Sequence, residues 1–347
     1  MTSHLVAPPR ATEVARPPAA PPRLRGVDAL RGLAVVGMLA VDNRGNDSIT
    51  PQLQHTDWDG LHLADVVFPV FLLVVGVSMP FSRRAARPRD VLARVLKLAL
   101  LGWLVVTAKY GPGVVGAGVL GHIAGAYLLC WLLLRLPRAA QPVAAVAVLA
   151  GLTVATRLAG ATPDRSWGHL VDGALGLPFS AEAPHSYLGS AVTVYLGVLA
   201  GRALQQAPGR PALVRLVAGG AAALATGLAL APLVPVNKRL WSPSFVLVTA
   251  GIGLLALAAL HWLADQRGVR RPLRPAEVLG ANAIVAFVFS ELVFRAALGG
   301  TVQPAVDGWV SSVAGATVSA WLYPAVSVTV IWAVCAVLLR RGVVVRV

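Results

Sequence analysis

The stretch LHLADVVFPVFLLVVGVSM (residues 61–79) decides the fold class of this chain of 347 residues. Asp65 is its only Asp, Glu, Lys or Arg, and nearly every residue after Asp65 is apolar. A helix that crosses a bilayer needs about 20 mostly apolar residues, whereas a strand of a membrane barrel alternates apolar with polar residues. The run therefore predicts a transmembrane helix near 63–82, with Asp65 just inside its start.

Nine other runs share this continuous apolar character. They lie near 27–42, 91–108, 113–136, 142–160, 187–204, 212–234, 244–264, 276–298 and 317–340. Hydrophobic residues make up 56% and charged residues 13% of the chain, against about 45–50% and 25% in soluble domains. The charges are too few to coat soluble domains, and the apolar side chains are too many for a disordered chain. We predict an all-α, polytopic integral membrane bundle of about ten transmembrane helices.

Basic residues outnumber acidic ones by 30 to 15, which gives a net charge of +15. In a soluble protein this excess would suggest nucleic acid, but in membrane proteins Lys and Arg gather in cytoplasmic loops. The basic segments follow alternate helices, so we predict two cytoplasmic termini, a multi-pass protein of the plasma membrane and no nucleic-acid partner. Residues 1–26 are rich in Pro and Arg, which predicts a disordered cytoplasmic tail rather than a signal peptide. Residues 27–347 form the predicted transmembrane domain.

The segment 41–65 holds the densest group of polar side chains in the sequence. Its candidate site residues are Asp42, Asn43, His55, Asp57, Trp58 and Asp65. His55 is the best catalytic candidate, because imidazole near neutral pH can take a proton or carry an acyl group. A loop histidine bonded to water is the alternative. For Asp65, a helix cap and a carboxylate inside a site are both open.

The segment VNKRLWSPSF (236–245) places cations on the side of the membrane where few are predicted. Its candidates for binding an anionic or sugar ligand are Asn237, Lys238, Arg239 and Trp241, and anchoring at the membrane interface is the alternative. Asn282 and Glu291 are further substrate-binding candidates within an apolar run. An ion pair between Glu291 and Arg295 is the alternative there.

Two other residues are candidates for contacting a donor molecule. Arg31 suits phosphate, although an ion pair with Asp28 on the same helix face is the alternative. His122 lies in a Gly-rich run, where a hydrogen bond between helices is the alternative. The two cysteines form no metal-ligand cluster, and the sequence contains no P-loop, HExxH or GxSxG motif. We therefore predict no metal.

Six blocks occur in a characteristic order along the chain. They are RLRGVDALRGLAVVGMLAVDN (23–43), QHTDWDGLHLADVVFPVFLLVVGVSM (54–79), GVLGHIAGAYLL (118–129), YLGVLAGRAL (195–204), VNKRLWSPSFVLVTAG (236–251) and LGANAIVAFVFS (279–290). In this order the blocks resemble the heparan-α-glucosaminide N-acetyltransferase family. The first block and NKRLWSPSFVL are the most specific.

The resemblance implies an integral membrane enzyme that takes acetyl from cytosolic acetyl-CoA and places it on a terminal glucosamine amine across the membrane. It assigns the family's essential histidine to His55, the asparagine of the preceding loop to Asn43 and an acidic residue to Asp65. The chain departs from the family at GHIA (121–124), where Gln and Arg are replaced, and at APHS (183–186), where acidic residues are replaced. We expect a bacterial member without the lumenal N-terminal region of animal enzymes.

These observations predict a transmembrane acyltransferase in a lipid bilayer, with acetyl-CoA as co-substrate and an amino sugar or similar amine as acceptor. His55 would act as a base in direct transfer or as a transient acetyl carrier. The sequence leaves the oligomeric state open, with a homodimer as one option. The alternative function is a transporter or flippase of a small or sugar-linked solute, without covalent chemistry.

Overall fold

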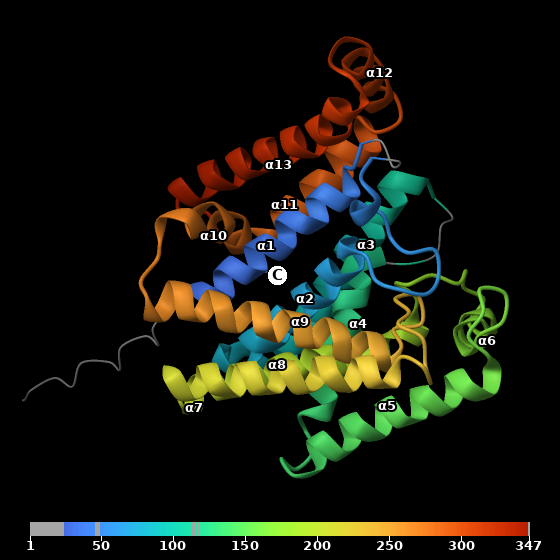
Figure 1. Ribbon diagram of the computed structural model, residues 1–347, viewed down its shortest axis with the longest axis vertical. Helices are drawn as coiled ribbons and strands as arrows, with labels where there is room; N and C mark the ends of the chain where they lie inside the picture. Colours follow the sequence, from blue (N-terminus) through green and yellow to red (C-terminus); the bar gives the residue numbers. More distant parts are fainter. Residues whose placement is uncertain (1–23, 46–48, 113–115, 117, 346–347) are drawn as a thin grey trace, which may run out of the picture.

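The computed structural model describes residues 24–45, 49–112, 116 and 118–345. The regular elements within these ranges are all helices, which confirms the predicted all-α class (Figure 1). Most of the predicted disordered tail, residues 1–23, lies outside the described residues.

Thirteen α-helices follow one another in the described chain. They are α1 (Arg25–Asp42), α2 (Leu63–Ser78), α3 (Pro88–Tyr110), α4 (Gly118–Leu133), α5 (Ala140–Ala159), α6 (Trp167–Ala174), α7 (Tyr187–Gln206), α8 (Arg210–Leu230), α9 (Pro243–His261), α10 (Arg274–Ala281), α11 (Ala283–Phe289), α12 (Val302–Ala314) and α13 (Ala316–Arg340).

Every predicted span falls on a helix, but not every helix is long and apolar enough to cross a membrane by itself. Among the described residues seven are: α2, α3, α5, α7, α8, α9 and α13, some with their terminal turns. Helix α4 has only 16 residues, and α1 carries charges at both ends and at Asp28 and Arg31. A bent pair of helices raises the number to eight, against the predicted ten.

The bent pair corrects the prediction of one continuous span at 276–298. Helix α10 ends at Ala281 and α11 begins at Ala283, with an angle of 71° between the two parts of the pair. The side chain of Asn282 lies at the break, where it donates to the carbonyl of Val343 and accepts from the amide of Val345. These hydrogen bonds tie the break to the segment after α13, which the local apolar pattern does not reveal.

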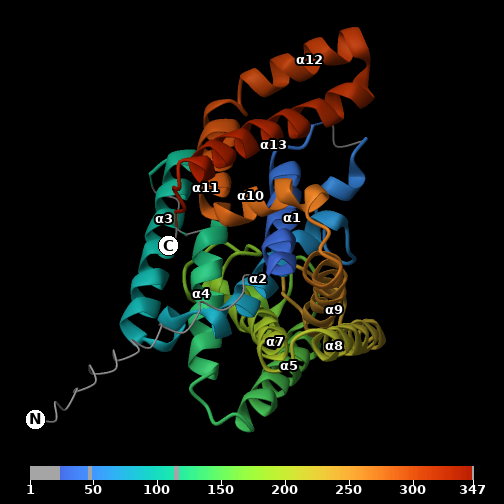
Figure 2. The ribbon, with the colours of Figure 1, turned by 90° about the vertical axis from the view of Figure 1, so that its left-hand side faces the viewer.

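Helices α2, α7 and α9 are mostly buried and form the centre of the bundle, whereas α3, α5, α8 and α13 expose most of their surface. Glycines let the central helices approach closely: a Cβ atom on Gly76 would lie 1.9 Å from the carbonyl oxygen of Val194, and one on Gly197 would lie 2.0 Å from that of Leu73. Small residues serve the same purpose in other membrane helix pairs. Helices α12 and α13 run side by side at one edge (Figure 2).

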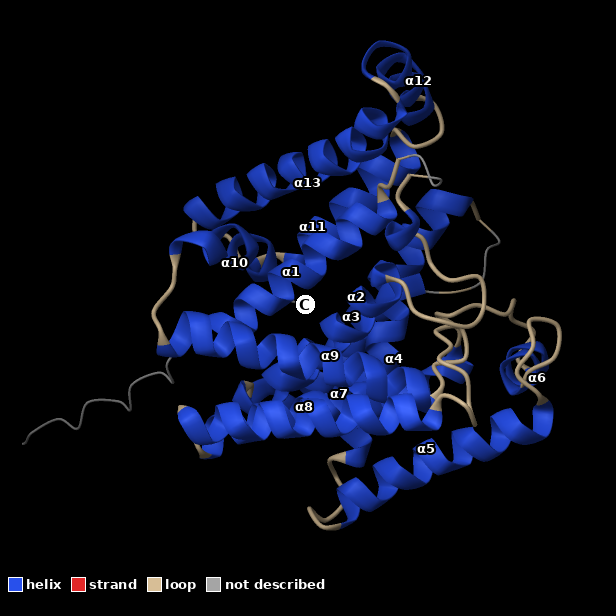
Figure 3. Cartoon of the chain, in the orientation of Figure 1, coloured by secondary structure: helices blue, strands red, loops and turns tan. Residues whose placement is uncertain are grey.

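The two ends of the bundle differ in character. One end, called here the basic end, contains the arginine-rich segment 266–274. There Asp265 accepts hydrogen bonds from the backbone amides of Arg25 (2.8 Å) and Gly26 (3.1 Å) and so caps α1. The long loops gather at the opposite end, called here the site end (Figure 3). The described parts of these loops are 43–45, 49–62, 160–186 and 231–242, and they contain most of the predicted site residues.

Candidate active site

The carboxylate of Asp65 performs both of the roles that the sequence left open. It is the third residue of α2, and its Oδ2 accepts from the backbone amide of His62, the residue just before the helix, at 3.1 Å. The same oxygen accepts from the backbone amide and the hydroxyl of Thr56, at 3.1 and 3.2 Å. Its other oxygen lies 2.9 Å from Nδ1 of His55. One buried carboxylate therefore caps the helix and fixes the orientation of the imidazole.

His55 is half-buried, with 44% of its side chain exposed, whereas Asp65 is fully buried. An ionised carboxylate only accepts hydrogen bonds, so His55 carries its proton on Nδ1, toward Asp65. Nε2 then carries the lone pair that can act as a base or a nucleophile. This arrangement of a histidine oriented by a carboxylate is the one used in many nucleophilic active sites.

Lys238 completes the group from a loop 183 residues further along the chain. Its Nζ lies 3.1 Å from Nδ1 and 3.2 Å from Nε2 of His55, and 3.8 Å from Oδ1 of Asp65. Only 10% of the Lys238 side chain is exposed. Burial lowers the pKa of Lys238 below the ordinary value of 10.5, while the negative charges of Glu182 and Asp65 oppose that shift.

The loop that carries Lys238 is tied directly to the loop that carries His55. The side-chain amide of Asn237 donates to the carbonyl of Trp58 at 2.8 Å and to Asp59 at 3.2 Å. The amide of Gly60 donates to the carbonyl of Val236 at 2.9 Å. Asn237 thus joins the two loops of the site, and its contact with substrate stays a prediction.

Trp241 ends this turn in an unusual backbone conformation. Its φ of +46° lies in the left-handed region that residues other than glycine rarely adopt. The indole is fully buried and donates to the hydroxyl of Thr193 at 3.2 Å, and it packs against the rings of Phe68 and His122. Backbone strain of this kind persists where surrounding contacts hold it, and functional sites are a common place for it.

These residues lie in and beside a segment that matches a known family. The family model for the catalytic region of heparan-alpha-glucosaminide N-acetyltransferase matches residues 23–218, more than half of the chain. The chain belongs to this family.

The human heparan-alpha-glucosaminide N-acetyltransferase is 25% identical over 359 aligned positions, which cover 79% of this chain and 53% of the human protein. The mouse heparan-alpha-glucosaminide N-acetyltransferase is 40% identical over 83 residues, which are 24% of this chain and 12% of the mouse protein. The chain therefore spans about half the length of the human relative. His55 and Asp65 lie within the range matched by the family model, and Lys238 lies beyond it.

In this member of the N-acetyltransferase family, a second polar group lies at the end of α1. Arg295 pairs with Asp42 at 2.8 Å and with Glu291 at 3.6 Å, and Glu291 also pairs with Lys109 at 2.8 Å. The ion pair considered for Glu291 and Arg295 is therefore present. Asp42 is near enough to Lys238 for its negative charge to favour the protonated lysine. Asp42 and Glu291 thus belong to one network of ion pairs, and Asp42 acts on Lys238 through its charge.

Asn43 follows Asp42 and is buried. Its side-chain amide donates to the carbonyl of Leu39 and to the hydroxyl of Ser290, both at 2.8 Å, while its Oδ1 has no hydrogen-bond partner. Both amide protons are therefore engaged in this geometry. A direct hydrogen bond from Asn43 to a reacting group would require one of these contacts to break.

The other predicted substrate residues differ in accessibility. Asp57 and Arg239 are exposed beside the two site loops. Trp58 donates its indole N–H to the carbonyl of Ala161 at 2.6 Å, which fastens the His55 loop to the 160–186 loop. Asn282 lies nine residues before Glu291, roughly 13 Å away along a helix, and holds the helix break. The structure therefore does not bring Asn282 to the site.

The two candidate donor contacts lie in different parts of the family member. Arg31 pairs with Asp28 at 3.1 Å, the alternative considered above, and donates to the hydroxyl of Ser78 at 2.6 Å, toward the basic end. His122 is fully buried beneath Trp241, where its ring nitrogens face the hydroxyls of Ser190 and Ser186. Among the described residues no group of His, Cys, Asp and Glu could hold a metal ion.

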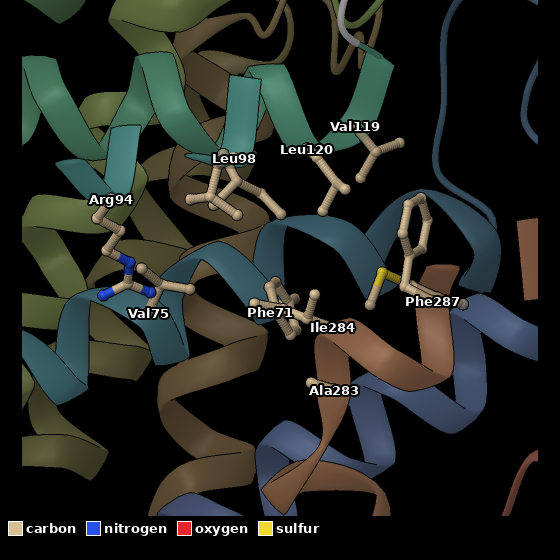
Figure 4. A pocket seen from close by; sticks show the side chains of 11 residues that line it. Phe71, Val75, Arg94, Leu98, Val119, Leu120, Ala283, Ile284 and Phe287 are labelled. Atoms are coloured by element: carbon tan, nitrogen blue, oxygen red, sulfur yellow. The ribbon is translucent and has the colours of Figure 1, made fainter. Parts of the chain in front are cut away.

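A small cavity lies between the two ends, among α1, α2, α3, α4 and α11 (Figure 4). Its volume is about 40 Å³, and its lining is apolar except for Arg94. The guanidinium of Arg94 lies 4.6 Å from the ring of Tyr127, and its buried Nε has no hydrogen-bond partner. Neither Arg94 nor Lys109 could be singled out from the sequence, because α3 carries four cations, Arg89, Arg94, Lys97 and Lys109, and its local sequence does not distinguish them.

Proposed function

We propose that this protein is a transmembrane N-acetyltransferase that uses acetyl-CoA and transfers the acetyl group at His55. The observation that carries the proposal is the contact of His55 and Asp65, which lie within the residues that the family model matches, with Lys238, which lies beyond them. The human relative's name supports an acetyl acceptor with a glucosamine amine. An amino sugar or a similar amine is accordingly the proposed acceptor.

Two routes fit the lone pair on Nε2 of His55. In the covalent route Nε2 attacks the thioester carbonyl, the C–S bond breaks, and coenzyme A leaves as the thiolate. The acceptor amine then attacks acetyl-histidine and gives up a proton as the amide forms. In the direct route the amine attacks the thioester carbonyl while Nε2 takes the amine proton, the C–S bond breaks, and coenzyme A leaves as the thiolate. Asp65 holds the ring in both routes.

Lys238 is placed to stabilise the charge that develops in either route. Its ammonium lies beside Nε2, so it can donate to the carbonyl oxygen of a thioester under attack at that nitrogen. A donor fixed in a water-poor site stabilises such an oxyanion strongly. Asp42, Asp57 and Glu291 supply negative charge nearby for an amine acceptor, and Arg239 and Trp58 lie at the edge of the same loops.

The donor is proposed to approach from the basic end, which would face the cytoplasm of a plasma-membrane protein. Arginines there, Arg31 included, suit the phosphates of coenzyme A. The cavity that contains Arg94 lies along this direction. At about 40 Å³ the cavity is smaller than a pantetheine arm, so the proposal includes a separation of the helices around it. Residues 27–347 constitute the proposed acyltransferase domain.

The direct test is acetyl transfer by the purified protein in nanodiscs, with labelled acetyl-CoA and a panel of amino sugars. We expect saturable consumption of the thioester and a labelled amide product. His55→Ala should lower the rate by about 100- to 10,000-fold and leave the protein folded. His62→Gln is the matched control, because the ring of His62 lies 3.0 Å from the carbonyl of Gln54 and a glutamine amide can keep that hydrogen bond. This variant should keep the rate within a few-fold.

Two results would contradict the proposal. Full acetyl transfer by His55→Ala would remove His55 from the reaction. Movement of a solute across the membrane of proteoliposomes, without consumption of any thioester, would favour the transporter or flippase instead. Labelled acetyl on His55 after rapid quenching would select the covalent route over the direct one.

A further inference from the structure

A second histidine–carboxylate pair lies in the 160–186 loop, outside the residues used above. Nδ1 of His185 lies 2.8 Å from Oδ2 of Asp172, and both side chains are fully buried. Nε2 of His185 lies 2.7 Å from the backbone carbonyl oxygen of Arg239. His185 belongs to the APHS block, where the chain departs from the pattern of its family.

Both ring nitrogens of His185 therefore face oxygen atoms. Nε2 donates to the backbone carbonyl of Arg239, which can only accept, and Nδ1 shares a hydrogen bond with the carboxyl group of Asp172. Aromatic rings enclose the pair: Phe179 stacks on His185 and Trp167 meets its edge. Gly168 leaves room for it, because a Cβ atom there would lie 3.0 Å from the His185 ring. The surroundings hold the imidazole in one orientation.

The acceptor carbonyl belongs to the residue that follows Lys238. His185 is thus linked to the backbone immediately after the lysine whose ammonium contacts His55. Glu182, three residues before His185, also acts on Lys238 through its negative charge. One short segment of the 160–186 loop therefore approaches the Lys238 turn at two points.

The Lys238 turn needs such support for a physical reason. It ends at Trp241, whose positive φ costs conformational energy, and it holds a lysine side chain out of water. Asn237 fastens the turn on the side of the His55 loop. The hydrogen bond from His185 fastens the opposite side, at the carbonyl of Arg239.

We propose that His185, held by Asp172, is a positioning residue that fixes the Lys238 turn and so keeps the Lys238 ammonium against His55. This inference rests on the proposed acetyl transfer for its kinetic consequence. The positioning itself does not depend on that function, and it is measured separately below.

The test compares His185→Leu, which has a similar volume and no donor, with His185→Gln, whose side-chain amide can still donate to the Arg239 carbonyl. His169→Leu is the matched control, because His169 stacks on the same Phe179 ring and belongs to the same loop. Two quantities are measured for each protein in nanodiscs: the pH profile of acetyl transfer, and the rate at which an amine-reactive reagent labels Lys238. Lys97 in the same peptide map serves as an internal reference.

We expect His185→Leu to lower kcat at least about tenfold and to move the alkaline limb of the profile to higher pH as Lys238 becomes hydrated. Labelling of Lys238 relative to Lys97 should become faster when it is measured above pH 10.5, where access to the amine and not its protonation sets the rate. His185→Gln should recover part of each change, and His169→Leu should show none. A loss of kcat in His185→Leu with unchanged Lys238 labelling and an unchanged pH profile would overturn the inference. If the wild type shows no acetyl transfer but labelling still follows the expected order, the proposed function fails and the positioning role stands.

Discussion

The ammonium of Lys238 lies within 3.2 Å of both ring nitrogens of His55. An ammonium can only donate hydrogen bonds, so Lys238 faces the imidazole as a donor. The carboxylate of Asp65 lies 3.8 Å from the same ammonium and balances its positive charge. The three side chains therefore form one group of hydrogen-bonded and ion-paired residues.

The substitution Asp65→Asn should reverse the proton positions on His55. Oδ2 of Asp65 accepts from three donors, so an asparagine must place its oxygen there and turn its NH2 group toward Nδ1. The ring must then carry its proton on Nε2 and loses the reactive lone pair. We expect acetyl transfer to fall by about 100- to 10,000-fold, measured as kcat.

Asp90→Asn is a suitable control for this prediction. Asp90 is the acidic residue in the first turn of α3, so this variant removes a charge from a helix start without touching the site. It should keep kcat and lose at most about 1 kcal/mol of stability. Equal losses of kcat in the two variants would show that Asp65 acts only as a helix cap.

The pH dependence of acetyl transfer should report on Lys238. Burial lowers the pKa of Lys238 below 10.5, so a reaction that needs its ammonium declines on the alkaline side at a pH below 10.5. Arginine stays protonated throughout this range. Lys238→Arg should therefore move the alkaline limb of the kcat profile to higher pH, whatever the loss in absolute rate. An alkaline limb at the same pH in both proteins would contradict a role for the ammonium.

The same pKa shift predicts the direction of a stability change. Because the pKa of Lys238 is lower in the folded protein than in the unfolded chain, the unfolded chain binds more protons between those two pKa values. The free energy of unfolding therefore rises with pH across that window and levels off above 10.5. In Lys238→Met this contribution disappears, so Tm plotted against pH should have a shallower slope than in the wild type. Equal slopes would contradict the buried state of the lysine.

The contact between α2 and α7 should not tolerate a methyl group. In Gly76→Ala the new Cβ atom would lie 1.9 Å from the carbonyl oxygen of Val194, so the central helices must separate. We expect a loss of about 1–3 kcal/mol or more, seen as a lower Tm or a lower yield of monodisperse protein. Gly219→Ala in α8 is the control, since its Cβ atom meets nothing within 4 Å, and it should be neutral or stabilising.

The ion pairs of Glu291 predict that one substitution lowers the stability of the protein and that a second substitution restores it. Glu291→Gln leaves Lys109, whose side chain is 14% exposed, without its carboxylate. Breaking such a pair typically costs about 3–5 kcal/mol, whereas replacing both partners by apolar residues is often neutral. Glu291→Gln should lower Tm clearly, and the double variant Lys109→Met with Glu291→Leu should recover most of the loss. A double variant as unstable as Glu291→Gln would contradict this account.

Much of the fold could be predicted because a bilayer imposes one simple rule on each span. Long apolar runs such as 63–82 become helices, since backbone groups in lipid must be paired within the helix. The helix break at Asn282 could not be predicted, because its cause is not local. It depends on hydrogen bonds to a segment about 60 residues further along the chain, and local hydropathy carries no information on such a partner.

The candidate site also has residues that the sequence could indicate and contacts that it could not. His55 and Asp65 are ten residues apart, so one polar segment indicated both as candidates, although not their contact. The cations of VNKRLWSPSF indicated a ligand or a membrane anchor. The contact of Lys238 with His55 joins two distant loops and could not be read from one sequence. Asp172 and His185 were not recognised as a pair, because each is a single polar residue in a loop with several others.

Asp65 both caps α2 and holds the imidazole of His55, and these two roles together set the position of the proposed reaction relative to the lipid. A membrane helix adjusts to a thicker or thinner bilayer chiefly by tilting. Because the carboxylate that begins α2 also holds the imidazole, any such tilt carries the ring along with the helix. The imidazole of His55 therefore keeps the same position relative to α2 when the lipid composition varies. The loops and the peripheral helices adjust to the bilayer instead.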